Sequence, residues 1–216
     1  MNTESARQQM VLQQVRTWDV FDPAVLSAIA SVPRDRYVPA AVRHCAYADS
    51  EIPLPHGQCM LRPSIVGRIL QALDIQPDDD VLEIGTGTGY LTACLAALAR
   101  TVTSVDIHAD FIAGAERNLA EAGVDNVRLR CMDASRELPD GQFSAIAVTA
   151  ALETVDARFV AALKPGGRLF VVVGRSPVMT ATLVRRDVDG TTSSADLFET
   201  DIPMLVSAPA RAVFSF

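Results

Sequence analysis

The stretch Val81-Leu82-Glu83-Ile84-Gly85-Thr86-Gly87-Thr88-Gly89-Tyr90 decides the fold of this chain. A short apolar run ends in an acid and in three alternating glycines, and an apolar helical pattern follows over residues 91–98. This order predicts a buried strand, a tight turn and the start of a helix. Glycines let the backbone approach a ligand closely, and the free N–H groups of a helix start make the turn electropositive. The turn is therefore a candidate ligand site.

Two features of the turn favour S-adenosylmethionine over a dinucleotide. The dinucleotide fingerprint is G-x-G-x-x-G, whereas this turn reads G-x-G-x-G and has Tyr90 where the third glycine would fall. Glu83 would place a carboxylate beside a bound pyrophosphate, which is unfavourable. The same carboxylate near an ammonium or sulfonium group is favourable.

Composition indicates one globular domain. The chain has 216 residues, of which 49% are hydrophobic and 21% charged, and its formal net charge is -7. An acidic chain of this kind predicts no nucleic-acid partner. Solvated helix faces account for the arginines scattered through the first third of the chain, which are Arg34, Arg36, Arg43, Arg62 and Arg68.

The chain is expected to be soluble and cytoplasmic, without a membrane partner. Its first residues show no secretory signal, and no uncharged apolar segment reaches spanning length. Cys45, Cys59, Cys94 and Cys131 are isolated from one another. This spacing predicts free thiols and supports neither a disulfide framework nor a zinc site, so no metal is expected.

The first part of the chain, residues 1–75, is expected to form a helical lead-in that covers the substrate. Helices are predicted over 3–17 and 22–31, with Asp22 as the N-cap of the second. Five prolines then punctuate an ordered, irregular segment over 33–62. Pro63 begins a helix that runs to about residue 73.

From Val81 onward, strands and helices alternate. Strands are predicted at 81–84, 101–106, 126–131, 143–149 and 168–174, and helices at 89–99, 109–122 and 153–163. Lys164-Pro165-Gly166-Gly167 is a predicted turn, and further strands are predicted at 179–187, 193–199 and 211–216, with Asp189-Gly190 turning the first pair. The alternation predicts an α/β, Rossmann-type doubly wound sheet that is mostly parallel, over residues 76–216.

Acids at strand ends are candidate ligand groups, because ligands of open α/β sheets bind at the carboxyl ends of strands. Asp106 follows the glycine turn by about 20 residues and can accept hydrogen bonds from both ribose hydroxyls. Asp133 can accept from an adenine amino group, with Ala134 next to it, and Ile107 can pack on the adenine face. For each acid the alternative is a helix N-cap, and for Ile107 it is an ordinary core position.

The three histidines give a weaker signal. His44 is expected at a helix end and His108 follows the ribose acid, and solvated or internally bonded imidazoles account for both. His56 lies in the irregular segment before the sheet.

With these residues assembled, the chain resembles the protein-L-isoaspartate O-methyltransferase family over residues 11–209. The markers are Val32-Pro33-Arg34, Tyr37-Val38, Ala46-Tyr47-Ala48-Asp49, Pro53, Gly57-Gln58, Pro63, the glycine motif from Leu82 to Tyr90, Val148-Thr149-Ala150-Ala151 and Ile202-Pro203. The resemblance implies a seven-stranded sheet that binds S-adenosylmethionine, with the lead-in closing over the donor. It also implies methyl transfer to the free carboxylate of isoaspartyl residues in damaged proteins. The residues expected to bind the donor are Glu83, Gly85, Thr86, Gly87, Gly89, Tyr90, Asp106, Ile107, Asp133, Ala134 and Thr149.

One departure from the family pattern affects the acceptor side. The family's loop after Gly-Gln reads Thr-Ile-Ser, and the serine is assigned to the active site. Here Gly57-Gln58 is followed by Cys59-Met60-Leu61, so Leu61 occupies the serine position. Leu61 cannot donate a hydrogen bond, Cys59 lies two residues early, and Arg62 is the nearby cation that could bind an anionic acceptor. A solvated arginine is the equal alternative for Arg62.

Three functions remain open at this stage. The first is a methyltransferase acting on isoaspartyl carboxylates or on another acceptor. The second is an NAD-dependent oxidoreductase, which Tyr90 and the lack of a catalytic Tyr-x-x-x-Lys set disfavour. The third is a regulatory protein that binds S-adenosylmethionine without transferring its methyl group. The sequence leaves the oligomeric state open, although the apolar tail over 212–216 could dock at a sheet edge.

Overall fold

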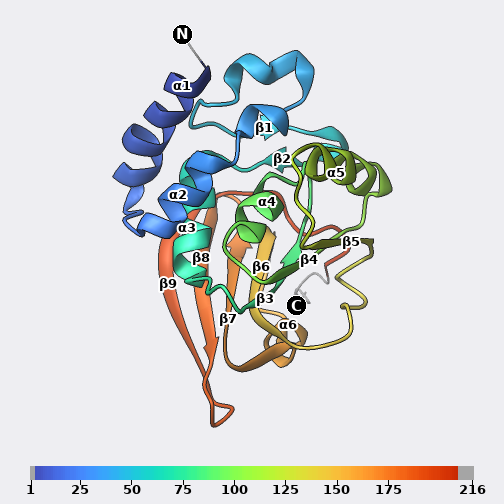
Figure 1. Cartoon of the computed structure of the whole chain (residues 1–216). Coiled ribbons are helices and arrows are strands. Elements are labelled where there is room, and N and C mark those ends of the chain that lie inside the picture. The colour runs from blue at the N-terminus through green and yellow to red at the C-terminus, as the bar shows by residue number, and fades with distance from the viewer. Residues whose placement is uncertain (1–2, 209–216) are drawn as a thin grey trace.

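A seven-stranded sheet forms the centre of the structure, a computed structural model that describes residues 3–208 (Figure 1). The strands lie in the order β5-β4-β3-β6-β7-β8-β9. Pairing is parallel from β5 to β7 and antiparallel for the last two pairs. This confirms the predicted mostly parallel, Rossmann-type sheet. The strands are β3 Asp80–Ile84, β4 Thr101–Asp106, β5 Val127–Cys131, β6 Phe143–Leu152, β7 Leu163–Arg175, β8 Val178–Arg186 and β9 Thr192–Thr200.

The sheet is buried on both faces, as a doubly wound fold requires. On β3, Val81 packs in one hydrophobic core, whereas Leu82 and Ile84 pack in a second core. Because both faces of the strand need apolar side chains, the strand appears in the sequence as a nearly continuous apolar run. The first core includes side chains from α3 Pro63–Leu73, α4 Tyr90–Ala96 and α5 Ala109–Glu121, and the second includes Phe159 from α6 Ala157–Ala161.

The first helices of the lead-in pack on its last helix, α3, beside the sheet (Figure 1). Helix α1 Thr3–Met10 continues as a π-helix over Val11–Val15 and a 3₁₀ turn over Arg16–Trp18. Helix α2 Pro23–Ser31 begins at Asp22, whose side chain accepts from the N–H groups of Ala24 and Val25, as predicted. A Cβ at Gly67 of α3 would lie 2.6 Å from Val15. The helices can approach this closely because residue 67 has no side chain.

The irregular segment after α2 is ordered, as predicted. It consists of 3₁₀ turns and one short pair of antiparallel strands: turns Arg34–Arg36, Ala40–Cys45 and Pro55–Gly57, and strands β1 Ile52–Pro53 and β2 Cys59–Met60. Asp49 accepts a hydrogen bond from the Ser64 N–H at 3.1 Å, so the segment is also joined to the start of α3.

The region between β6 and β7 differs from the prediction. Strand β6 runs on to Leu152, and α6 is only five residues long, where a helix was expected over 153–163. Residues 164–167, expected as a turn, lie within β7 as a bulge between the pairs Phe143–Leu163 and Ala145–Arg168. Lys164 bonds to Asp80 at 2.8 Å, and this cross-strand contact holds the bulged segment against the sheet.

The C-terminal part of the sheet agrees with the prediction. The last two strands form a hairpin whose turn is closed by a hydrogen bond from Gly190 N–H to the Asp187 carbonyl. The strand expected over 211–216, and the apolar tail within it, lie outside the described residues. Among residues 3–208, no helix is both long and apolar enough to cross a membrane.

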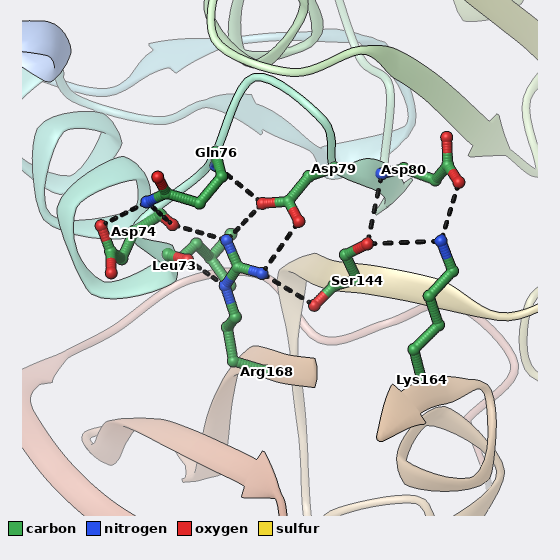
Figure 2. A network of polar contacts seen from close by, with 8 residues as sticks. All are labelled: Leu73, Asp74, Gln76, Asp79, Asp80, Ser144, Lys164 and Arg168. Carbon is green, nitrogen blue, oxygen red and sulfur yellow. Dashed lines mark hydrogen bonds and ion pairs between the residues drawn. The ribbon is translucent and has the colours of Figure 1, made fainter. Parts of the chain in front are cut away.

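A buried ion pair joins the bulge to the end of α3 and the start of β3 (Figure 2). The Arg168 guanidinium contacts Asp79 at 2.5 Å and donates to the carbonyls of Leu73, Asp74 and Ser144. Both side chains of the pair are at most 10% exposed. Burial tends to raise the pKa of Asp79, but the bonds from Arg168 and the Gln76 N–H outweigh it and hold that pKa below its usual value.

We expect Arg168→Met to lower the free energy of unfolding by about 3–5 kcal/mol, because it leaves a buried carboxylate without its partner. The decrease in the free energy of unfolding should be largest near neutral pH, where the Asp79 carboxyl is ionised. The lowered pKa of Asp79 contributes stability above the unfolded value of about 3.9, and this contribution disappears as the pH falls below that value. Urea denaturation from pH 3 to 7 measures both effects.

Arg100→Met is the matched control, because Arg100 pairs with Asp80 but is 58% exposed. Its effect on the free energy of unfolding should be much smaller, because solvent screens an exposed ion pair. Equal losses for the two variants would contradict the structural role of Arg168.

Candidate active site

The glycine turn joins β3 to α4 at the point where strand order reverses, between β3 and β6. Gly85 has φ 99°, and a Cβ there would lie 2.1 Å from Thr149 Oγ1. Thr149, on β6, donates a hydrogen bond of 3.0 Å to the carbonyls of Ile84 and Gly85. Gly85 is therefore required both by its backbone angle and by the closeness of the neighbouring strand. The predicted strand, turn and helix start are all present.

Gly89 has a different role from Gly85. It precedes α4 with φ 84°, and a Cβ would lie 3.1 Å from Ala115 of α5. The residue thus permits two helices to pack closely and does not line either of the two cavities described below.

Asp106, at the end of β4, lies directly against the turn. Its carboxylate accepts from Gly87 N–H and from His108 N–H, each at 3.0 Å. The side chain is largely buried, yet it lines the cavity beside the turn. Each carboxylate oxygen has a second lone pair, so the group can still accept hydrogen bonds from a ligand.

A cleft of about 630 Å³, open to solvent, lies over the carboxyl ends of β3, β4 and β6. Lead-in residues 54, 58 and 59 form one wall, and residues 203–206 form another. Of the residues predicted to bind the donor, the cleft brings together Gly85, Gly87, Asp106, Ile107, Asp133, Ala134 and Thr149.

Asp133 also lines the cleft, as do Ile107 and Ala134. Its Oδ1 accepts from the backbone N–H of Ser135 at 3.0 Å and from the Ser135 hydroxyl at 2.6 Å. Its Oδ2 forms an ion pair of 3.3 Å with Arg136. Asp133 therefore closes the turn in which it lies and borders the cleft at the same time, so both predicted roles are compatible with its position.

A second cavity of about 350 Å³ adjoins the cleft and is lined in part by the loop of residues 59–61. It shares Leu54, Cys59 and Thr149 with the cleft, and Thr86, Tyr90 and Leu61 line it. Leu61 is buried, and its apolar side chain lines this cavity.

The loop is held by Arg34, which was expected to be solvated and is instead fully buried. Its guanidinium donates to the Leu61 carbonyl at 2.8 Å and to the Ala46 carbonyl at 2.9 Å, and it lies 4.9 Å from the centre of the Tyr90 ring. The expectation was wrong because charge spacing alone cannot reveal a buried cation bonded to carbonyls. In the sequence, only the position of Arg34 within the family marker Val32-Pro33-Arg34 indicated that this arginine differs from a solvated one.

The two other candidates on the acceptor side differ in position. Cys59 lines both cavities, and burial together with Glu51 raises the pKa of its thiol to about 12, so it is a neutral thiol near pH 7. Arg62 lies before α3 with its guanidinium 5.3 Å from the Trp18 ring. It lines neither cavity.

Glu83 is buried beneath the turn and does not border the cleft. Its Oε2 accepts from Thr92 at 2.5 Å and from Ser104 at 2.6 Å, and Ser104 bonds in turn to Thr86. Burial raises the pKa of the Glu83 carboxyl to about 8, against the opposing effect of these hydrogen bonds. Glu83 is thus placed to orient the turn from behind.

Comparison with known proteins places the chain in a family. A model of the family described as Protein-L-isoaspartate(D-aspartate) O-methyltransferase (PCMT) matches residues 5–207. The chain belongs to this family. A protein-L-isoaspartate O-methyltransferase from Paracoccus denitrificans is 40% identical over 190 residues, covering 87% of this chain and 88% of the relative. One from Opitutus terrae is 42% identical over 169 residues, covering 78% and 72%.

The fold is shared with solved members of the isoaspartate methyltransferase family. A putative protein-L-isoaspartate O-methyltransferase from Plasmodium falciparum, solved in complex with S-adenosyl-L-homocysteine, superposes with a TM-score of 0.80. It is 18% identical, and the match covers 95% of this chain and 98% of that one. A second protein-L-isoaspartate O-methyltransferase has a TM-score of 0.78 and 22% identity, over 92% and 65% of the two chains.

Membership makes this chain an S-adenosylmethionine-dependent methyltransferase of the isoaspartate family. The residues present fit such a donor. The turn approaches the cleft without side chains at Gly85 and Gly87, and Asp106 offers a carboxylate beside it. The oxidoreductase alternative is thereby set aside.

Replacing Glu83 by Gln keeps an oxygen for Thr92 and Ser104 but removes the ionisable group. The folded pKa of about 8 lies above the ordinary value of 4.5. The protonated carboxyl therefore contributes stability that is complete below that value and is lost as the pH rises toward 8. We expect the unfolding free energy of the wild type to fall relative to Glu83→Gln by on the order of 2–3 kcal/mol between pH 5 and 8.

Urea denaturation at several pH values measures this difference. The same change at the exposed Glu121 controls for the general loss of a carboxylate. Parallel pH profiles for wild type and Glu83→Gln would mean that the buried carboxyl ionises normally in the folded protein.

Proposed function

We propose that this chain binds S-adenosylmethionine in the cleft and transfers its methyl group to the free carboxylate of isoaspartyl residues in proteins or peptides. The single observation that carries the donor placement is the Asp106 carboxylate, held against the glycine turn by Gly87 N–H at 3.0 Å. In this proposal Asp106 accepts from the ribose hydroxyls, and Ile107, Asp133 and Ala134 surround the adenine. Thr149 and Glu83 shape the turn.

The proposed reaction does not require a strong general acid or base from the protein. The donor supplies an electrophilic methyl on a sulfonium, and the acceptor carboxylate is already ionised near neutral pH. The chain must therefore hold the two in line and exclude water. The apolar and neutral groups that line the second cavity, among them Leu54, Cys59 and Leu61, are suited to excluding water.

We propose that the exchange of serine for leucine at position 61 weakens this reaction. The loop is fixed by the bond from Arg34 to the Leu61 carbonyl, and Cys59 is a neutral thiol. The Leu61 side chain has no hydrogen-bond donor, and a neutral thiol is only a weak one, so neither group offers a strong donor to the reacting carboxylate. A protein that binds the donor and regulates another process is the second candidate, and the same leucine favours it.

We further propose that residues 1–75 and 76–216 act as a single domain in the cytoplasm. Both parts supply walls of the cleft, through Leu54 and Gln58 on one side and the strand ends on the other. A reducing compartment suits the thiols at Cys45, Cys59, Cys94 and Cys131, which are free. Transfer of labelled methyl from S-adenosylmethionine to an isoaspartyl peptide, and to cell extract, tests the acceptor directly.

Asp106→Ala should weaken binding of S-adenosylhomocysteine by at least tenfold, measured by calorimetry. Hydrogen bonds to a charged partner contribute roughly 1.5–3 kcal/mol each, and the variant would lose those from the ribose. Because Asp106 also accepts from Gly87, circular dichroism and thermal unfolding should accompany the titration. Asp125→Asn is the control, because it neutralises an exposed carboxylate that does not line the cleft. Unchanged affinity in a folded Asp106→Ala protein would refute the ribose assignment.

Leu61→Ser should increase the rate of methyl transfer to isoaspartyl peptide. An oriented hydroxyl that stabilises the reacting carboxylate can contribute about 2–4 kcal/mol, so the wild type should be slower than a serine-containing relative by two or three orders of magnitude. Leu61→Ala controls for the loss of apolar volume. Wild-type turnover equal to that of such a relative would show that the hydroxyl is dispensable.

A further inference from the structure

Three side chains capable of binding a metal meet at the mouth of the cleft. His56 lies on the 3₁₀ turn Pro55–Gly57 of the lead-in, His108 directly precedes α5, and Asp110 is in the first turn of α5. One ligand atom from each lies within 4.8 Å of the others. The expectation of no metal rested on cysteine spacing, which says nothing about this cluster, because its members are separated by up to 54 residues.

The cluster already joins the lead-in to α5 through the contact between His56 and Asp110. His56 Nε2 donates to both oxygens of Asp110, at 3.1 and 3.0 Å. The His56 and His108 rings are stacked, with centres 3.9 Å apart and planes 5° from parallel. His108 Nε2 is buried and has no hydrogen-bond partner among the described residues.

We propose that His56, His108 and Asp110 form a binding site for a divalent transition metal such as Zn²⁺. Two imidazoles and a carboxylate are a common ligand set for this ion, with water in the fourth position. The metal takes the place of the hydrogen on His56 Nε2 that now contacts Asp110. A neutral ring then carries its hydrogen on Nδ1, and a proton leaves to solvent only from a doubly protonated ring. The metal also gives the buried nitrogen of His108 a partner.

Coordination requires a small rearrangement. Bonds of about 2.0–2.1 Å in a tetrahedral site place ligand atoms roughly 3.3 Å apart, so the three groups must approach one another. The rings must also leave the parallel stack, because each lone pair lies in the plane of its own ring. The His56 side chain is 40% exposed, which leaves it room to turn.

The charges around the site select the kind of metal. Arg36, Arg43 and Arg117 line the groove that includes Asp110. These cations disfavour an ion held by charge alone, so binding depends on the imidazole nitrogens. Mg²⁺ and Ca²⁺, which prefer oxygen ligands, are therefore not expected to bind.

The proposed metal site lies between two walls of the cleft. His108 lines the cleft, and His56 is two residues from Gln58, which lines the opposite wall. A metal bound to both ties the lead-in to the sheet domain across the mouth of the cleft.

Calorimetric titration of the whole protein with ZnCl₂, in a buffer that does not chelate metals, tests the proposal. The wild type should bind one equivalent and unfold at a higher temperature with Zn²⁺ than without it. Affinity should fall at least tenfold in His56→Asn, His108→Asn and Asp110→Asn. Asparagine suits position 56 because it tolerates the left-handed backbone found there, with φ 60°.

Two variants serve as matched controls. His44→Ala removes the remaining histidine, and Cys131→Ser removes an exposed thiol that could bind zinc by itself. Both should bind as the wild type does. No binding by the folded wild type, equal binding by the His56→Asn protein, or loss of binding in either control would overturn the proposal, as would comparable binding of Mg²⁺.

Discussion

The hydrogen bond from Gly87 N–H to the Asp106 carboxylate is the contact on which the site depends. It can form because Gly85 N–H donates to the Val105 carbonyl at 2.8 Å, which brings the turn beside the end of β4. Thr149 fixes the same turn from β6. Three neighbouring strands therefore meet at one loop, and glycine is required there because the strands leave no space for a side chain. The ligand-binding geometry is a consequence of sheet packing.

Buried charged groups make the arrangement specific. Arg34 joins the segment after α2 to the loop of Leu61, and Arg168 joins the end of α3 to β7. A guanidinium has five donors, so one side chain can bond to carbonyls of several segments at once. Removing either cation would leave several buried carbonyls unpaired. Such contacts fix the relative positions of segments that apolar packing alone could accommodate in several ways.

Much of this structure could be predicted from local patterns, and the failures have physical causes. Strand β4, helix α3 and the Asp22 cap follow from apolar periodicity and capping chemistry. The prediction of a helix over 153–163 was wrong because the apolar residues 150–152 extend β6. Only one short helix then fits before β7. Arg34, and the meeting of His56 with His108, depend on contacts between distant segments, which no local pattern contains. The role of Arg62 stays a prediction, and the structure places it outside both cavities.

The cleft wall formed by Leu54, Gln58 and Cys59 belongs to a segment with little regular structure. A ligand is enclosed only in those molecules whose lead-in is in place. The measured affinity is then the intrinsic affinity multiplied by the fraction of such molecules. Substitutions at remote positions such as Gly67 can therefore change the apparent dissociation constant without touching the ligand. The stability of the lead-in is thus a second determinant of affinity, separate from the contacts that the glycine turn itself makes.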